Sequence, residues 1–258
     1  MYGICNLSIV PCRREPSDKS EMVTQLLFGD TFQVTETQGN WCHIKISYDD
    51  YDCWIDKKQF LPIQQHTFDI INSTDLICSN EFVQLINHKN TNHQLPIVIG
   101  SSLPNYDAGE CTIENQTYIF DGDIIKDYLP NEKNGIIESA YQFLNSPYLW
   151  GGKSPFGIDC SGFTQLVYKL NGIRLKRDAY QQAEQGEILS FVEEAEPGDL
   201  AFFDNEEGRI VHVGIVLENN KIIHASGKVR IDGFDHHGIF NNDKKDYSHQ
   251  LRLLKRIV

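Results

Sequence analysis

Basic residues are scarce in this chain of 258 residues, in which 23 Lys and Arg stand against 36 Asp and Glu. The formal net charge is −13, and Lys and Arg form no cluster along the sequence. Nucleic acids and anionic membrane surfaces attract proteins through such basic clusters. The charge pattern therefore argues against both as partners and favours a small or neutral one.

Long apolar runs are also missing. Nowhere do about 18 apolar residues follow one another, which is the length that a membrane-spanning helix needs. The N-terminal segment M-Y-G-I-C-N-L-S-I-V-P lacks a basic stretch followed by an apolar core and a small-residue cleavage site, the pattern of a secretory signal. We therefore expect a cytoplasmic protein with no membrane partner.

The seven cysteines are an odd number, and no two of them form a C-x-x-C pair. This pattern argues against a disulfide framework or a zinc ribbon and favours reduced thiols in a reducing compartment.

The two halves of the chain differ in periodicity. Residues 1 to about 128 contain short β-rich runs between Gly and Asn turns, such as Trp41–Ile46, and such runs are typical of small barrels. After the break Pro130-Asn131-Glu132-Lys133 the pattern becomes helical, and strands follow from Gly198 to the C-terminus. We predict an α+β chain with small all-β modules at residues 1–62 and 63–130 and a larger α+β domain at residues 131–258.

One segment, Y-L-W-G-G-K-S-P-F-G-I-D-C-S-G-F-T-Q-L-V-Y-K-L at Tyr148–Leu170, places a cysteine at the start of a predicted helix. Asp159 or the adjacent backbone caps this helix, which runs from Cys160 to Leu170. The positive end of a helix dipole favours the thiolate, so Cys160 is a candidate nucleophile. The alternative is that Cys160 is a small buried apolar residue.

Two histidines interrupt apolar strand patterns, His212 in I-V-H-V-G-I-V and His224 in K-I-I-H-A-S. They are 12 residues apart, a spacing that suits adjacent antiparallel strands joined by the E-N-N-K turn. A cysteine nucleophile needs a base and a group that orients this base, and the two histidines could fill these roles for Cys160. Each histidine could instead be a hydrogen-bonded core residue.

A metal site is a further alternative. Cys160, His212 and His224 could bind zinc, but they form no compact ligand motif. The segment I-D-G-F-D-H-H-G contributes further candidate cation ligands, for which a solvated loop is the commoner explanation. The candidate ligands in this segment are Asp232, Asp235, His236 and His237. We therefore predict neither a metal nor a cofactor.

Four motifs in the expected order, P-Y-L-W-G-G-K-S-P-F-G-I-D-C-S-G-F, P-G-D-L-A-F-F, V-H-V-G-I-V and I-I-H-A-S, resemble the NlpC family of cell-wall cysteine peptidases, which have a papain-like fold. The resemblance covers residues 132–258. It implies hydrolysis of γ-D-glutamyl bonds to a diamino acid in peptidoglycan stem peptides. Cys160 then matches the nucleophile, His212 the general base and His224 the residue that orients the base.

The segment from Arg13 to Phe60 resembles the bacterial Src-homology-3-like modules that precede such domains. It departs from their pattern at Cys53, where the family usually has Gly before Trp54. Residues 63–128 would then be a second, diverged module.

Enzymes of the layout that this chain resembles act on cytosolic wall fragments, and their N-terminal module narrows the cleft so that only peptides with a free L-alanine amine fit. The resemblance implies that Asp159 pairs with this ammonium group, beside Tyr148 and Ser161, and that Tyr51 and Glu21 of the first module close the pocket. Asp159 could instead be a helix cap, and Tyr51 and Glu21 a core-edge aromatic residue and a solvated charge. Arg177 and Gln182 match polar positions of the family, or they lie on a surface helix.

Together these observations predict a cysteine peptidase that releases L-alanyl-γ-D-glutamate from a small muropeptide in cell-wall recycling. The alternatives are a secreted hydrolase of intact peptidoglycan, a non-catalytic wall-binding protein, and a thiol acyltransferase on the same fold.

Overall fold

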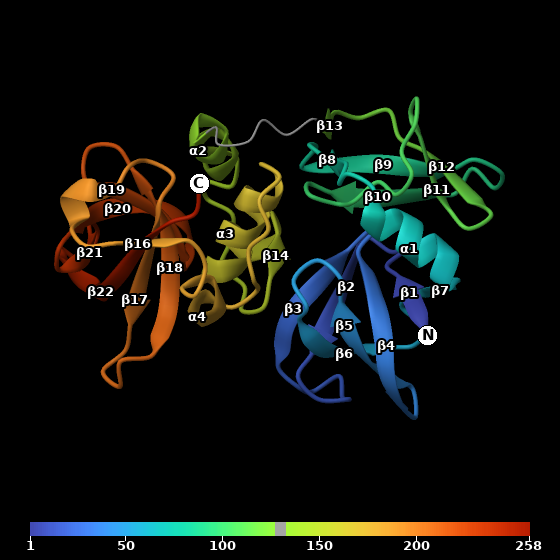
Figure 1. Ribbon diagram of the computed structural model, residues 1–258, viewed down its shortest axis with the longest axis horizontal. Coiled ribbons are helices and arrows are strands. Elements are labelled where there is room, and N and C mark those ends of the chain that lie inside the picture. The colour runs from blue at the N-terminus through green and yellow to red at the C-terminus, as the bar shows by residue number, and fades with distance from the viewer. Residues whose placement is uncertain (127–132) are drawn as a thin grey trace. The chain divides into compact units, whose positions relative to one another are not determined.

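The computed structural model describes residues 1–126 and 133–258, which fall into two units, Met1–Tyr128 and Leu129–Val258 (Figure 1). The predicted boundary between residues 130 and 131 lies outside the described residues. None of the helices within the described ranges is long and apolar enough to cross a bilayer.

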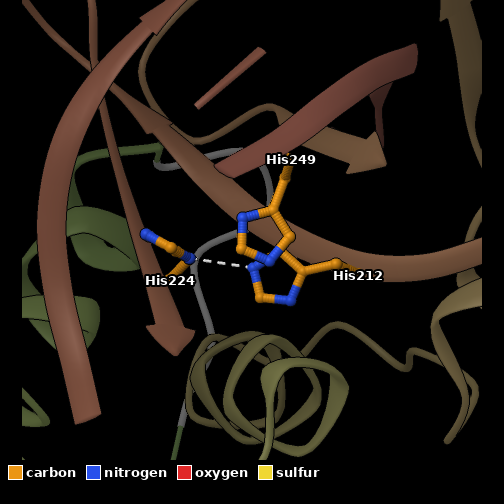
Figure 2. Close-up of side chains that lie close together, drawn as sticks. All are labelled: His212, His224 and His249. Carbon is orange, nitrogen blue, oxygen red and sulfur yellow. Dashed lines mark hydrogen bonds between the residues drawn. The ribbon is translucent and has the colours of Figure 1, made fainter. Parts of the chain in front are cut away.

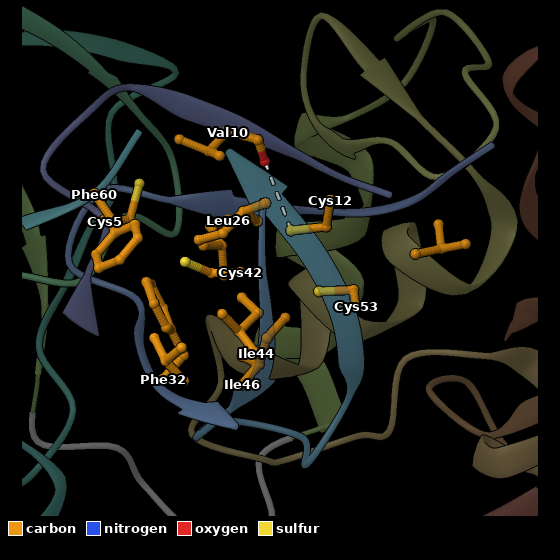
Figure 3. Packing of buried hydrophobic residues seen from close by; sticks show 13 residues of the cluster. Cys5, Val10, Cys12, Leu26, Phe32, Cys42, Ile44, Ile46, Cys53 and Phe60 are labelled. Carbon is orange, nitrogen blue, oxygen red and sulfur yellow. Dashed lines mark hydrogen bonds between the residues drawn. The ribbon is translucent and has the colours of Figure 1, made fainter. Parts of the chain in front are cut away.

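The first unit begins with a small antiparallel β-barrel, whose strands follow the order β3-β2-β6-β5-β4-β1-β7. These strands are β1 (Tyr2–Ile4), β2 (Ile9–Arg13), β3 (Met22–Leu27), β4 (Thr31–Gln38), β5 (Trp41–Ile46), β6 (Asp52–Asp56) and β7 (Leu61–Ile63). In β5 the side chains of Cys42, Ile44 and Ile46 are buried and alternate with more exposed residues, as the sequence pattern predicts. Figure 3 shows the core, in which Cys5, Cys12, Cys42 and Cys53 lie among branched and aromatic side chains.

The rest of the first unit packs on this barrel. It contains α1 (Gln65–Ser73), β8 (Cys78–Ser79), β9 (Val83–His88), β10 (Gln94–Val98), β11 (Glu110–Ile113), β12 (Gln116–Ile119) and β13 (Ile124–Ile125). Its main sheet has the order β10-β9-β12-β11. Ile4 and Phe28 of the barrel belong to the same apolar cluster as Ile86 and Ile97 of this sheet, so the two parts share a core. The sequence pattern did not reveal α1.

The second unit consists of helices and an antiparallel barrel. It contains α2 (Lys133–Gln142), β14 (Lys153–Ser154), β15 (Gly157–Ile158), α3 (Cys160–Lys169), α4 (Ala179–Gln182), β16 (Glu187–Leu189), a 3₁₀ helix (Val192–Glu194), β17 (Leu200–Asp204), β18 (Ile210–Leu217), β19 (Lys221–Ser226), β20 (Lys228–Asp235), β21 (Gly238–Asn241) and β22 (Asp246–Arg256). The sheet order is β16-β22-β17-β18-β19-β20-β21, and pairing of β21 with β22 closes the barrel. The predicted α+β class is confirmed.

Helix α3 is the central helix of this unit and begins where the sequence predicts. Asp159 is the N-cap of this helix. Its backbone is extended, and its side chain accepts a hydrogen bond from the backbone N–H of Gly162. Every residue of α3 is buried, and the helix packs against β18 and β19. Cys160 is therefore held between a capped helix start and the barrel wall.

Gly162 is needed for close packing in the first turn of α3. A Cβ atom at this position would lie 2.4 Å from the carbonyl oxygen of Gly152 and 2.9 Å from Oδ1 of Asp159. Although Ala is favoured over Gly by up to about 1 kcal/mol in an ordinary helix, we expect Gly162→Ala to lower the free energy of unfolding by about 1–3 kcal/mol.

Thermal and urea unfolding would measure this change. The control is Gly233→Ala on β20, where the nearest atom to the added Cβ is 3.4 Å away, and we expect a change within about 0.5 kcal/mol there. A Gly162→Ala variant more stable than the original protein would contradict the packing argument.

Candidate active site

A chain of three polar side chains crosses the interior of the barrel at its β18, β19 and β20 strands. His212 lies on β18, His224 on β19 and Asp232 on β20. Because side chains alternate along a strand, each of them faces the same way as an apolar residue two or four positions away. These apolar residues, Val216, Ile222 and Phe234, belong to the barrel core. The three polar groups therefore point into the barrel.

The contacts within this chain are direct. The distance from His212 Nε2 to His224 Nδ1 is 2.8 Å, and that from His224 Nε2 to Oδ2 of Asp232 is 3.1 Å. Figure 2 shows the hydrogen bond between the two rings. Both imidazoles are buried, and the Asp232 carboxylate is completely buried. The structure thus brings the two predicted histidines together and adds Asp232, which the sequence analysis assigned to a solvated loop.

Asp232 has further partners that keep it ionised. Arg230 donates from Nε to Oδ2 at 2.6 Å and from Nη2 to Oδ1 at 2.9 Å, and the backbone N–H of Asn242 donates to Oδ1 at 3.1 Å. Burial alone would raise the pKa of Asp232, but the hydrogen bonds from His224, Arg230 and Asn242 outweigh it and hold the pKa below its ordinary value. Asp232 is therefore a carboxylate at neutral pH.

Both imidazoles are neutral at neutral pH, because burial disfavours their charged forms. Burial lowers the pKa of His212 well below its ordinary value, and the neighbouring His224 and His249 lower it further. Burial also lowers the pKa of His224, while Asp232 opposes this shift. A neutral imidazole is the form that accepts a proton, so His212 has the protonation state of a general base.

His249 on β22 is a third histidine at this site, and the sequence analysis missed it. Its ring stacks on that of His212, with 4.1 Å between the ring centres and 22° between the planes (Figure 2). Burial lowers the pKa of His249 to about 4, so its ring is also neutral. No motif marks His249, because the contact arises only when β22 closes the barrel.

Nitrogen atoms of His212, His224 and His249 lie within 4.8 Å of one another, which raises the question of a metal centre. Two nitrogen ligands on one zinc ion lie about 3.3 Å apart when each bond is about 2.0–2.1 Å. The separation of 2.8 Å between His212 and His224 is that of a hydrogen bond. The rings of His212 and His249 are stacked, so the lone pairs of their nitrogen atoms lie in nearly parallel planes and do not point at a common centre. This geometry favours a hydrogen-bonded chain.

Helix α3 packs against β18, and its first residue, Cys160, lies within hydrogen-bond reach of the backbone of Val213, which directly follows His212 in that strand. Burial raises the pKa of the Cys160 thiol to about 12, and the charge of Asp159 adds to this effect. A hydrogen bond from the backbone of Val213, which follows His212, lowers it, as do the charge of Arg177 and the backbone of Ser161. The helix start does favour the thiolate, since the backbone of Ser161 lowers the pKa, but burial has the larger effect. The resting site holds a neutral thiol and a neutral imidazole.

Asp159 does more than cap α3. Its carboxylate forms two hydrogen bonds with the Arg177 guanidinium, Nη1 to Oδ1 at 3.1 Å and Nη2 to Oδ2 at 2.7 Å. It also accepts from the backbone of Gly162 at 2.6 Å and of Gly151 at 2.9 Å. The helix-cap role is confirmed, while its pairing with a substrate ammonium stays a prediction. The carboxylate already has a buried cation as a partner, which the sequence analysis did not foresee.

Arg177 and Gln182 are buried, with exposed fractions of 1% and 0%, so they do not lie on a surface helix. Arg177 also donates to the hydroxyl of Ser161 at 2.9 Å. Gln182 donates to the carbonyl of Ser161 at 3.0 Å and accepts from Thr164 at 2.7 Å. These contacts tie the segment around α4 to the first turn of α3 and so hold Cys160 in place.

The other predicted pocket residues are divided between the two units. Tyr148 is half-buried, and burial raises the pKa of its phenol. The charges of Cys160 and Asp159 raise this pKa further, so Tyr148 lies near both residues. Tyr51 packs against the core of the first barrel, and Glu21 forms a 2.6 Å ion pair with Arg14. The roles of Tyr51 and Glu21 in closing a pocket stay predictions.

The buried neutral thiol has a measurable consequence. Because the pKa of Cys160 is raised, we expect its alkylation by iodoacetamide to accelerate steadily from about pH 5 to about pH 9, with no plateau from a preformed thiolate. Mass spectrometry of the native protein would follow the site of modification. Cys160, 7% exposed, should react before the six other cysteines, each less than 2% exposed.

Cys160→Ala serves as the control, since it should remove the fast modification. A rate that stays constant across this pH range would instead show a thiolate–imidazolium pair at rest.

Comparisons with known proteins identify two families along the chain. Residues 145–246 match the NlpC/P60 family, and residues 12–60 match the bacterial dipeptidyl-peptidase Sh3 domain. A gamma-D-glutamyl-L-lysine dipeptidyl-peptidase of Bacillus subtilis (strain 168) is 31% identical over 217 residues, which cover 78% of this chain and 71% of the relative. Dipeptidyl-peptidase 6 of Lysinibacillus sphaericus is 26% identical over 253 residues, which cover 89% of this chain and 90% of the relative.

The fold is shared with a crystal structure of an NlpC/P60 family protein from Bacillus cereus ATCC 10987. The TM-score is 0.84 at 20% sequence identity, and the match covers 100% of this chain and 99% of the other. The resemblance inferred from the four motifs is confirmed, and so is the prediction of an enzyme. The chain belongs to the NlpC/P60 family of cell-wall cysteine peptidases.

Proposed function

We propose that this peptidase hydrolyses the γ-D-glutamyl bond to a diamino acid in muropeptides whose N-terminal L-alanine is free, as part of cell-wall peptide recycling in the cytoplasm. The observation that carries the proposal is the buried His212–His224 pair on the strand whose Val213 backbone contacts Cys160. The names of the relatives support the bond specificity, since they describe release of a dipeptide and, in one case, cleavage between γ-D-glutamate and lysine.

The proposed reaction uses Cys160 as the nucleophile. His212 accepts the thiol proton as the sulfur attacks the γ-carbonyl carbon of D-glutamate, and the backbone N–H of Cys160 donates to the resulting oxyanion. His212 then gives the proton to the amine of the diamino acid as the C–N bond breaks, leaving a thioester on Cys160. A water molecule, deprotonated by His212, hydrolyses the thioester and releases L-alanyl-γ-D-glutamate.

The neutral resting pair suits this sequence of steps. Charge develops on sulfur and on His212 only as attack proceeds, so the stabilising groups act mainly in the transition state. A non-catalytic wall-binding role is less well supported, because every member of the proton-accepting chain is present and hydrogen-bonded.

Recognition of the free amine is the second part of the proposal. Asp159 would accept a hydrogen bond from the L-alanine ammonium while it remains bound to Arg177, with Tyr148 and Ser161 beside it. Because Asp159 already pairs with Arg177, a substitution of Asp159 is a poor test of ammonium recognition. An Asp159→Asn variant would also disturb the α3 cap and the guanidinium contacts, so the substrate, rather than the protein, is the part to alter.

The catalytic roles predict a ranking among variants. Cys160→Ala and His212→Ala should each reduce kcat by about 10⁴-fold or more, since the attacking atom or the proton acceptor is lost. His224→Gln should lose only about 10- to 100-fold, because a carboxamide can still accept from His212 and donate to Asp232. Product formation from a synthetic L-alanyl-γ-D-glutamyl-diamino acid tripeptide, followed by mass spectrometry, would measure these rates.

Cys42→Ala, which removes a buried thiol from the first barrel, is the matched control and should keep its kcat. Wild-type turnover by His212→Ala would remove the assignment of the base.

The specificity proposal predicts that N-acetylation of the tripeptide lowers kcat/KM. Loss of the ammonium leaves a partly desolvated carboxylate with one partner fewer, at a cost of about 1–3 kcal/mol, which corresponds to a reduction of about 5- to 160-fold. Intact peptidoglycan, whose L-alanine amine is blocked, should be a poor substrate for the same reason. Parallel assays of free tripeptide, acetylated tripeptide and whole sacculi would measure the preference.

Equal rates on all three substrates would support the alternative, a secreted hydrolase of the intact wall. Efficient transfer of the acyl group to an added amine, in place of water, would support a thiol acyltransferase.

A further inference from the structure

We propose that Asp232 is a positioning residue that fixes the tautomers of both histidines, so that the unprotonated nitrogen of His212 is Nδ1, the one left for the thiol proton. The inference rests on the roles proposed above for Cys160, His212 and His224. It concerns a residue that does not touch the substrate and that acts through His224.

The tautomers follow from counting donors and acceptors. Asp232 is ionised and can only accept hydrogen bonds, so His224 must carry its proton on Nε2, the nitrogen that contacts Oδ2. Because His224 is neutral, its Nδ1 then has a lone pair and accepts from His212 Nε2–H. His212 is neutral as well, so its proton is on Nε2 and its Nδ1 is unprotonated. One carboxylate thus sets the proton positions on two rings.

The surroundings hold Asp232 in the orientation that this role requires. Arg230 donates to both carboxylate oxygens and the Asn242 backbone donates to Oδ1, so Oδ1 has two donors and Oδ2 has one besides His224. Gly214 lies opposite His224 on β18. A Cβ atom there would lie 3.0 Å from Cβ of His224 and 2.8 Å from Cδ1 of Ile222, so a side chain at this position would press against His224.

The same chain stabilises the charge that forms during catalysis. When His212 takes the thiol proton it becomes an imidazolium, and its Nε2–H still donates to His224. The negative charge of Asp232 lies one ring away and favours this cation. Asp232 stays ionised throughout, because Arg230 and Asn242 continue to donate to it.

Asp232→Asn inverts the pattern without changing the shape of the side chain. The amide NH₂ group must replace one oxygen, and at Oδ1 it would face two fixed donors, Nη2 of Arg230 and the Asn242 backbone N–H. At the Oδ2 position it faces one fixed donor, Nε of Arg230, and His224, which can change tautomer. The amide therefore donates to His224 Nε2, which moves the His224 proton to Nδ1 and the His212 proton to its own Nδ1. The proton acceptor for Cys160 is then blocked.

Nitrogen NMR of the ¹⁵N-histidine-labelled full chain at about pH 8 would report the tautomers directly, with His212→Gln and His224→Gln used for assignment. We expect protonation at Nε2 for both rings in the original protein and at Nδ1 for both rings in Asp232→Asn. The kcat of Asp232→Asn on the free tripeptide should fall by about 10²–10⁴-fold with little change in KM. The rate of Cys160 alkylation should fall as well.

Asp243→Asn is the matched control. It removes the other carboxylate that pairs with Arg230, at 2.9 Å, and leaves His224 untouched, so tautomers and kcat should stay at their original values. The proposal is overturned if Asp232→Asn keeps the original tautomers, or if Asp243→Asn lowers kcat as much as Asp232→Asn does. Should Asp232→Asn fail to fold, protonation of His224 at Nδ1 in the original protein would overturn the proposal by itself.

The tautomers and the alkylation rate are measured without peptide. If the tautomers are as expected and the tripeptide is not cleaved, the proposed function fails while the inference about Asp232 stands.

Discussion

The register of three neighbouring strands is the constraint on which the site depends. His212, His224 and Asp232 come from β18, β19 and β20 and meet inside an otherwise apolar barrel. Because side chains alternate along a strand, a shift of one residue in any of the three would turn its polar group to the other face of the sheet. Burial of unpaired polar groups is costly, so the hydrogen-bonded chain and the apolar residues beside it favour the same register.

The reactive thiol illustrates a competition between two electrostatic effects. A helix start favours the thiolate through its free backbone N–H groups, but burial disfavours any charge, and here burial is the larger effect. The negative charge of Asp159 near the sulfur raises the pKa of the Cys160 thiol further, while the charge of Arg177 lowers it. The site is therefore arranged for a base that takes the proton during attack rather than for a permanent thiolate.

Asp159 also connects structure with the proposed specificity. Its carboxylate joins the loop at Gly151, the first turn of α3 and the Arg177 segment, so the residue is structural before any substrate binds. A second cation would find a carboxylate whose orientation is already set by these hydrogen bonds. Such preorganisation lowers the entropic cost of binding, so the proposed ammonium would meet a group that needs no reordering.

The sequence by itself determined many of the strands, the start of α3 and the motifs that carry chemistry, although it did not reveal α1. Strand alternation, the cap before Cys160 and the glycines of the W-G-G and C-S-G segments are local features, and local features are encoded in neighbouring residues. The pairing of His212 with His224 was also accessible, because a short turn joins their strands. The sequence likewise indicated the NlpC resemblance, since its four motifs lie within such local segments.

Only the tertiary structure decided the remaining contacts. His249 reaches His212 through closure of the barrel by β22, and Arg177 reaches Asp159 across 18 residues of chain. Asp232 looked like part of a polar loop because Asp235, His236 and His237 follow it, yet it lies in β20 with its carboxylate in the core. The pKa of Cys160 depends on burial by residues far from it in sequence, and no local pattern records that burial. These features arise from long-range packing, which is why the sequence alone left them open.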